Sequence, residues 1–308
     1  MVMISYLRFF IMSMSLPTIS VYGFSKNYTT STFNQSFSRL FGDNHIVFLD
    51  DEGNSVQISL DQSTGSGFMS RVYYYYAYFS ASIKLPADYT AGVVVTFYTS
   101  NSNIYQNFHD ELDFEFLGNV RGQNWVVQTN VYGNGSTSRG REERYNLWFD
   151  PTQDSHTYSI LWVSKWIIFY VDNVPIREIR RVDAMGGDFP SKPMSLYATI
   201  WDGSSWATGG GKYKVNYQYA PFIAMYSDFV LYGCSVNPTQ KAQACHEDIG
   251  SDLNATFSGL TSQEKMRMKN FRSKYLKYSY CDDRARYSTP LPECVIDPQE
   301  ARKLQSEI

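Results

Sequence analysis

The chain has 308 residues, of which 43% are hydrophobic and 19% are charged, a composition that is typical of a globular protein and excludes a largely disordered one. A formal net charge of −3 provides no basic field for a phosphate backbone, so we expect no nucleic-acid partner and a neutral substrate. Aromatic residues make up 17% of the chain, which favours strands and sugar-stacking surfaces alike.

The first residues are predicted to be a secretion signal. Residues 1–23 contain one basic residue, Arg8, then an apolar stretch that ends at Leu16, and small residues near Gly23. The stretch is short and is broken by polar residues and Pro17, so we expect no membrane span. Four Asn-x-Ser/Thr sequences agree with secretion, although such tripeptides also arise by chance. These candidate N-glycosylation sites are Asn27, Asn34, Asn134 and Asn254.

Residues 47–231 predict many short strands. Apolar and polar residues alternate in short runs, and Gly, Asn, Asp and Pro separate the runs. Clear examples are residues 80–85, 92–98, 125–132, 156–162 and 166–171. No long helical period interrupts them, so we predict an all-β fold, an antiparallel β-jelly-roll sandwich, over residues 24–233.

Three acidic residues stand at alternate positions in one of these runs. On a strand, Glu111, Asp113 and Glu115 share one face, and three large apolar side chains share the other. The apolar face fixes the register, because a slip of one residue would bury the carboxylates. Asp110 faces the other way and is expected at the rim or in a hydrogen bond. His109 has no evident Ser or Cys partner, so we expect it to be structural.

The spacing of Glu111 and Glu115 is compatible with a retaining glycosidase. Such enzymes need two carboxyl groups about 5–5.5 Å apart, one as nucleophile and one as proton donor to the leaving oxygen. Residues four apart on a strand have Cα atoms about 13 Å apart, and two Glu side chains leaning inward close most of that gap. Asp113 between them would raise at least one carboxyl pKa. From spacing alone, an acidic strand facing water or a calcium site is the alternative.

The sequence changes in character at residue 234, where we place a C-terminal extension, residues 234–308. Thr261 and Glu264 have the spacing of a capping box, and Met268, Phe271 and Tyr275 follow at helical spacing. We therefore predict one helix, packed on the sandwich. Its basic residues are interpreted as a solvated face, with an anion-binding face as the alternative. These residues are Lys265, Arg267, Lys269, Arg272 and Lys274.

All four cysteines lie in this extension, at Cys234, Cys245, Cys281 and Cys294. We predict disulfides between neighbours, Cys234 with Cys245 and Cys281 with Cys294; three connectivities are possible, and four reduced thiols are the alternative. Neither pair has Cys-x-x-Cys spacing, so zinc is not expected. We expect no metal and no cofactor.

At this point the chain resembles a known family. Residues 109–118, HDELDFEFLG, resemble the active-site signature of the plant xyloglucan endotransglucosylase/hydrolases in glycoside hydrolase family sixteen. Residues 89–94, 128–130, 147–151, 158–162, 174–178 and 206–208 resemble further family blocks in the same order. The resemblance implies a β-jelly roll with a concave substrate cleft, with Glu111 as nucleophile, Glu115 as general acid/base and Asp113 as helper between them.

The resemblance also implies residues that bind the substrate. Two polar residues share a strand face and match cleft positions, two tryptophans lie in a segment similar to a sugar-stacking one, and two arginines match acceptor-side positions. In that order, these residues are Gln128 and Asn130, Trp201 and Trp206, and Arg141 and Arg286. Core packing is the alternative for the tryptophans, and an ordinary half-exposed strand is the alternative for the polar pair.

The function implied is cleavage of the β-1,4-glucan backbone of xyloglucan with retention, followed by transfer to a xyloglucan oligosaccharide or polymer in the cell wall or apoplast. With water as acceptor the same scaffold is a xyloglucan hydrolase, and a catalytically silent glycan-binding jelly roll is a third hypothesis. Residues 119–121 lack the sequon that often follows the family signature, and residues 140–146 resemble a branch that contains both transferases and hydrolases. The ratio of transfer to hydrolysis is therefore open. We expect a monomer.

Overall fold

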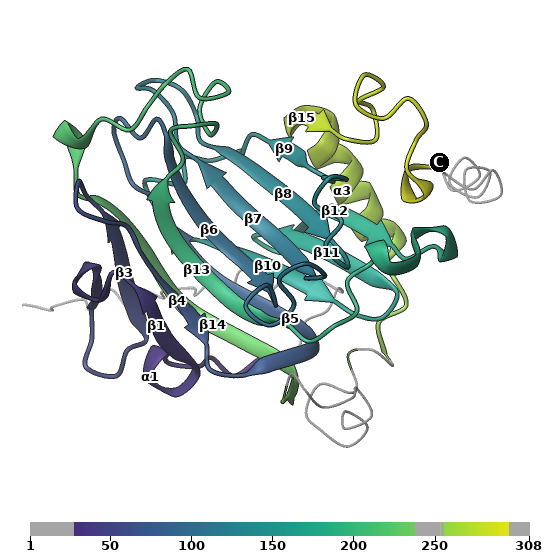
Figure 1. The fold of residues 1–308 in the computed structure, drawn as a ribbon, viewed down its shortest axis with the longest axis horizontal. Helices are drawn as coiled ribbons and strands as arrows, with labels where there is room; N and C mark the ends of the chain where they lie inside the picture. The colour runs from purple at the N-terminus through teal and green to yellow at the C-terminus, as the bar shows by residue number, and fades with distance from the viewer. Residues whose placement is uncertain (1–27, 238–252, 254–255, 296–308) are drawn as a thin grey trace, which may run out of the picture.

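The computed structural model describes residues 28–237, 253 and 256–295. In this part of the chain the strands form two antiparallel sheets that pack face to face (Figure 1). One sheet has the order β1-β4-β13-β6-β7-β8-β9-β15, and the other has the order β12-β11-β10-β5-β14-β3-β2. The predicted all-β antiparallel sandwich is confirmed.

The strands of the eight-stranded sheet are β1 (Phe37–Phe41), β4 (Ser66–Ser70), β6 (Val93–Ser100), β7 (Glu111–Leu117), β8 (Val126–Tyr132), β9 (Glu143–Tyr145), β13 (Ser195–Asp202) and β15 (Leu276–Ser279). Those of the seven-stranded sheet are β2 (Ile46–Phe48), β3 (Ser55–Leu60), β5 (Tyr73–Lys84), β10 (His156–Trp162), β11 (Trp166–Val171), β12 (Val174–Arg180) and β14 (Phe222–Val236). Helices α1 (Phe33–Ser36) and α3 (Ser262–Tyr275) and the 3₁₀ turns η1 (Asp43–His45), η2 (Asp183–Asp188), η3 (Tyr217–Tyr219) and η5 (Pro292–Cys294) complete the described elements. None of the described helices is long and apolar enough to cross a membrane.

The core lies between the two sheets and fixes the direction of β7. Leu112, Phe114 and Phe116 of this strand are fully buried in the main apolar cluster. Phe114 contacts Phe169 of β11 in the opposite sheet, with ring centroids 5.2 Å apart. Alternation along the strand therefore turns the acidic residues to the outer face of the eight-stranded sheet, as predicted.

The predicted C-terminal helix is confirmed. Helix α3 begins after Thr261, which forms a reciprocal capping box with Glu264, and packs beside β12 (Figure 1). Phe271 reaches the main core, where its ring lies 5.5 Å from that of Tyr145 on β9. The strand that follows, β15, pairs with β9, so the extension adds the last strand to the eight-stranded sheet.

A buried ionic cluster joins the extension to the sandwich. Glu143 of β9 has a side chain only 4% exposed and accepts hydrogen bonds from Arg272 Nη1 and Nη2 at 2.6 and 2.8 Å and from Ser279 Oγ at 2.8 Å. Arg177 of β12 lies 3.5 Å from the same carboxylate. The charges of these two arginines outweigh the cost of burial and lower the pKa of Glu143 to about 2.

The described residues contain one of the two predicted disulfides. Cys281 and Cys294 are bonded, as predicted. The second predicted pair includes Cys245, which lies outside the described residues, as do the signal segment and the sequons at Asn27 and Asn254. Strand β14 continues to Val236, so it runs three residues past the domain boundary that we predicted at residue 233.

Candidate active site

Strand β7 occupies the middle of the eight-stranded sheet, hydrogen-bonded to β6 on one side and β8 on the other. On the outer face these three strands and β13 form a pocket of about 350 Å³. Its lining residues are Thr96, Tyr98, Glu111, Asp113, Glu115, Asn130, Tyr132, Thr199 and Trp201. The three acidic residues predicted from the sequence thus share one pocket. Each is held by a backbone that is paired on both sides.

Burial sets the protonation of the three carboxyl groups. It raises the pKa of Asp113 well above its usual range, and the negative charges of Glu111 and Glu115 on either side raise it further. Burial also raises the pKa of Glu111, against a hydrogen bond from Ser100 and the nearby charge of His109. Asp113 is therefore the carboxyl group that keeps its proton most readily, in the centre of the site, and in that form it can donate a hydrogen bond.

Glu115 has the protonation expected of a general acid. Burial raises its pKa to about 7, although a hydrogen bond from Gln128 opposes the shift. The Gln128 amide lies 2.5 Å from Glu115 Oε2. At mildly acidic pH Glu115 is thus protonated and can release its proton to a leaving oxygen, and its anion still has a donor to stabilise it.

Arg144 fixes the orientation of the Gln128 amide. Its Nε donates to Gln128 Oε1 at 2.7 Å. A guanidinium has donors and no acceptors, so the amide must turn its oxygen to Arg144 and its NH₂ group to Glu115. The sequence prediction gave Gln128 a role in binding sugar. The structure places its amide directly against the carboxyl group of Glu115.

The structure places Arg144, and not Arg141, beside the cleft. The side chain of Arg141 is fully buried, with Nη2 2.9 Å from Asp188 Oδ2 and Nε on the carboxylate of Glu293, so it has no surface to offer a sugar. This burial does not favour the predicted substrate contact of Arg141, which lies two residues before β9. Positions 141, 143 and 145 turn inward, whereas Arg144 turns outward and is exposed. Alternation counted back from the buried Tyr145 would have identified it.

Two of the predicted substrate-binding residues, Asn130 and Trp201, line the pocket, and Trp206 lies next to Trp201. Asn130 lines the pocket opposite Asp113 and accepts from the backbone N–H groups of Val131 and Arg141 at 2.9 and 2.8 Å. Trp201 also lines the pocket, and its ring centroid lies 6.2 Å from that of Trp206. Both rings are half-buried, which leaves part of each free to contact a sugar.

A stacked pair of tyrosines, which the sequence did not single out, lies at the pocket, where Tyr98 is part of the lining and Tyr197 is buried beside it. Tyr98 and Tyr197 have ring centroids 5.0 Å apart and an angle of 18° between their planes. Tyr98 lies beside Asp113 in the strand register. Burial raises the pKa of both phenols, to about 12 for Tyr197, so neither ionises in the working range of the site.

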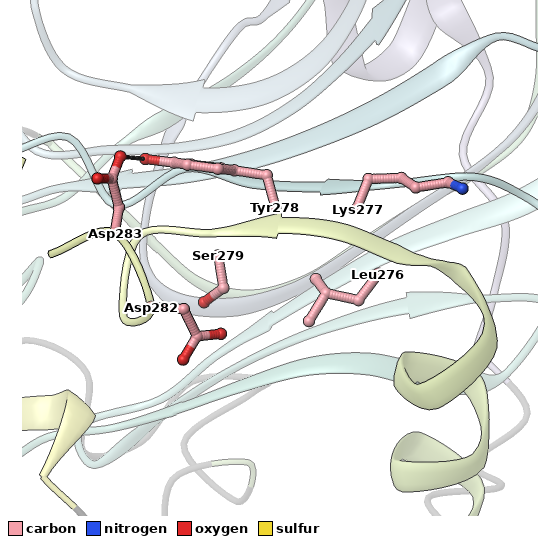
Figure 2. A pocket seen from close by; sticks show the side chains of 6 residues that line it. All are labelled: Leu276, Lys277, Tyr278, Ser279, Asp282 and Asp283. Carbon is pink, nitrogen blue, oxygen red and sulfur yellow. Dashed lines mark hydrogen bonds between the residues drawn. The ribbon is translucent and has the colours of Figure 1, made fainter. Parts of the chain in front are cut away.

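The C-terminal extension forms one wall near Glu115. Arg286 pairs with Glu142, and Arg144 lies over the Tyr278 ring, 5.8 Å from its centroid. Tyr278 in turn donates a hydrogen bond of 2.8 Å to Asp283 (Figure 2). The Arg286 side chain is 38% exposed, so it is accessible at this end of the cleft.

The residues before β7 hold the strand in place. Asp110 is fully buried and accepts from the backbone N–H groups of Asn134, Ser191 and Lys192 at 2.7 Å each, as well as from Lys192 Nζ at 2.7 Å. The expected hydrogen-bonding role is confirmed, although Asp110 lies inside the protein and not at the rim. We expected His109 to be a structural residue, but its buried Nδ1 has no hydrogen-bond partner in the described structure.

Comparisons with known proteins identify the family. Residues 33–219 match the model for "Glycosyl hydrolases family 16", and residues 249–294 match "Xyloglucan endo-transglycosylase (XET) C-terminus". The chain is 57% identical over 293 residues to "Probable xyloglucan endotransglucosylase/hydrolase protein 27" of Arabidopsis thaliana, covering 95% of this chain and 87% of that protein. It is 54% identical over 297 residues to "Probable xyloglucan endotransglucosylase/hydrolase protein 28" of the same plant, covering 96% and 89%.

Solved structures share the fold at lower identity. A Bacillus licheniformis β-glucanase superposes with a TM-score of 0.53 at 24% identity, covering 68% of this chain and 99% of that one. The Crh5 transglycosylase in complex with NAG gives a TM-score of 0.53 at 24% identity, covering 68% and 82%. With the fold, the carboxylate strand and the paired C-terminal match in place, the chain belongs to the xyloglucan endotransglucosylase/hydrolases of glycosyl hydrolase family 16.

Proposed function

We propose that the protein cuts the β-1,4-glucan backbone of xyloglucan with retention and transfers the cut chain to a xyloglucan oligosaccharide or polymer. One observation carries the proposal. Glu111 and Glu115 face the same pocket from β7, with the protonated Asp113 between them and the pKa of Glu115 raised to about 7. This is the division of roles that a two-step displacement requires.

In the first step, Glu111 attacks the anomeric carbon as a carboxylate. The glycosidic C–O bond breaks, and the leaving oxygen takes the proton of Glu115, so that Glu111 holds the sugar as an ester. A protonated Asp113 can donate a hydrogen bond to the Glu111 carboxylate in this step and thereby limit its motion. The Gln128 amide stabilises the Glu115 carboxylate that has just formed, because it already points at Oε2.

In the second step, Glu115 acts as the base. It removes a proton from an acceptor hydroxyl, the acceptor oxygen attacks the anomeric carbon, and the ester bond to Glu111 breaks. The acceptor sugar must therefore bind beside Glu115. We assign this role to the exposed Arg144 and Arg286, with Trp201 and Trp206 as aromatic surfaces along the cleft and Asn130 as a polar contact.

The experiment that tests the proposal supplies xyloglucan with a labelled xylogluco-oligosaccharide and follows label into polymer. We expect transfer by the wild type and none by Glu111→Ala, which should still bind the glycan because the nucleophile acts chiefly in the transition state. No transfer at any pH from about 4 to 8 would reject the proposed activity.

Roles within the carboxylate pair can be tested with azide. Glu115→Ala should be slow with poor leaving groups and should form a glycosyl azide of retained configuration, because azide needs no base to attack the ester on Glu111. An azide product of inverted configuration would reverse the assignment of the two residues.

A hydrolase is the second candidate function, since water can replace the sugar acceptor on the same scaffold. Arg144 and Arg286 are exposed to solvent, so water can reach this end of the cleft as well as sugar. Release of reducing ends without added acceptor measures hydrolysis, and its ratio to label transfer separates the two candidates.

We further propose that residues 1–23 direct secretion to the cell wall or apoplast, and that the exposed Asn34 and Asn134 are available for glycosylation. The protein acts as a monomer without a cofactor in this proposal. Endoglycosidase treatment and N-terminal sequencing of the protein secreted from plant cells test these points.

A further inference from the structure

A second groove lies between α3 and the edge strand β12, and it shares no residue with the catalytic pocket. Its volume is about 940 Å³, within the range of sites that bind small ligands or chain segments. Residues of α3 line one side, and the end of β12 with the turn after it lines the other. Figure 1 shows α3 beside β12. The cleavage and transfer steps proposed above do not involve this groove.

Cations line both walls of the groove. Lys265, Lys269 and Arg272 follow one another at intervals of four and three residues, so they form one row along α3. Arg180 and Arg181 line the opposite wall, at the end of β12. A bound chain would therefore have positive charge on both sides.

Several of these charges lack an internal partner. Arg272 is neutralised by Glu143, and the lining carboxylate Glu293 is neutralised by Arg141. In the part of the chain that the structure describes, Arg181, Lys265 and Lys269 form no ion pair. These three cations face one further carboxylate, Asp183, and the remaining pair of lining residues, Arg180 and Glu178, adds one charge of each sign. This excess of positive charge occurs in a chain whose net charge is −3.

The groove also presents an aromatic ring. Trp166 of β11 is half-buried and lines the groove, and the guanidinium of Arg180 lies 5.4 Å from the centroid of its ring. An indole face next to cations suits a sugar ring that carries a carboxylate, because the ring packs on the apolar surface while the carboxylate pairs with Lys or Arg.

We propose that this groove binds a linear polyuronate, which is an anionic polysaccharide with one carboxylate per sugar. The catalytic cleft on the other sheet binds the neutral glucan. Charge complementarity carries the choice of partner. A neutral glycan would leave the cations unused. Duplex DNA carries a much denser charge, which the negative protein as a whole repels. Binding would hold the enzyme on an acidic polymer without occupying its active site.

The test measures binding of the full-length protein to soluble polygalacturonate at low and high salt. We expect Lys265→Gln combined with Lys269→Gln to weaken binding by roughly 3- to 30-fold, since two ion pairs at a partly exposed surface are lost. The wild type should lose affinity as salt is raised to about 0.5 M. Transfer activity on xyloglucan should be unchanged in this variant.

A matched control removes the same charge from the same helix. Arg267→Gln combined with Lys274→Gln changes two cations of α3 that do not line the groove, and it should alter binding by less than about twofold. A fully methyl-esterified polygalacturonate should not bind. The proposal is overturned if the wild type does not bind polygalacturonate, if both double variants weaken binding equally, or if duplex DNA binds as tightly and depends on the same lysines.

Discussion

Replacing Glu143 by Gln should destabilise the whole protein, because this carboxylate is the centre of the ionic cluster between the sandwich and the extension. The change keeps the size of the side chain and leaves the buried Arg177 and the partly buried Arg272 without their anion. The pKa of Glu143 falls from 4.5 to about 2 in the folded state. A difference of that size corresponds to ~3 kcal/mol, and breaking a buried ion pair costs about 3–5 kcal/mol.

The dependence on pH follows from the direction of the shift. Because the folded pKa is the lower one, Glu143 contributes its full stability above about pH 4.5 and loses it as the pH falls toward 2. Thermal unfolding of the wild type and Glu143→Gln should therefore differ by roughly 6–15 °C at pH 6. The two melting temperatures should converge as the pH approaches 2.

The neighbouring Glu142→Gln is the control. Glu142 also pairs with an arginine, Arg286, but that arginine is 38% exposed. Its loss should cost about 0–1 kcal/mol. The reasoning about the buried cluster is refuted if Glu142→Gln destabilises the protein as much as Glu143→Gln, or if the difference between wild type and Glu143→Gln is the same at pH 3 as at pH 6.

Three further predictions concern the site. Transfer activity should decline as the pH rises through about 7, where Glu115 loses the proton it must donate. In Gln128→Leu this decline should occur at higher pH, because the hydrogen bond that lowers the pKa of Glu115 is lost, and kcat should fall about tenfold. Profiles of rate against pH for the two proteins measure both effects. Trp201→Ala should raise KM for xyloglucan by roughly 5- to 30-fold with little change in kcat, and an equal loss of kcat would place the ring nearer the reacting atoms. Cys281→Ser with Cys294→Ser should cost about 2–4 kcal/mol in chemical denaturation, and should reduce transfer more than hydrolysis because Arg286 lies in the loop they close.

Much of the catalytic strand could be read from the sequence because the period of a strand is unambiguous there. Acidic and large apolar residues alternate over residues 111–116, and burial of Leu112, Phe114 and Phe116 leaves one direction for the carboxylates. Helix α3 was also predictable, since its capping box and apolar stripe are local signals. In both cases a local pattern and the tertiary packing agree.

The contacts between distant segments could not be predicted in the same way. The position of Arg144 in the site depends on its hydrogen bond to Gln128, 16 residues earlier, and on its contact with Tyr278, which belongs to the extension. Strand β9 has only three residues, which is too short for an alternation of buried and exposed side chains to be recognised, so the sequence did not show which arginine points outward. A buried charge such as Glu143 looks like a surface residue in the sequence, because its burial depends on distant cations, one of which, Arg272, lies 129 residues away.

The pairing of β15 with β9 also protects the molecule from self-association. Strand β9 has three residues, and without β15 its outer backbone groups would form an open sheet edge next to the active site. Such edges recruit strands from other molecules and seed aggregates. The four-residue β15 takes that place and, being short, offers little edge of its own. An enzyme expressed without its extension should therefore lose solubility.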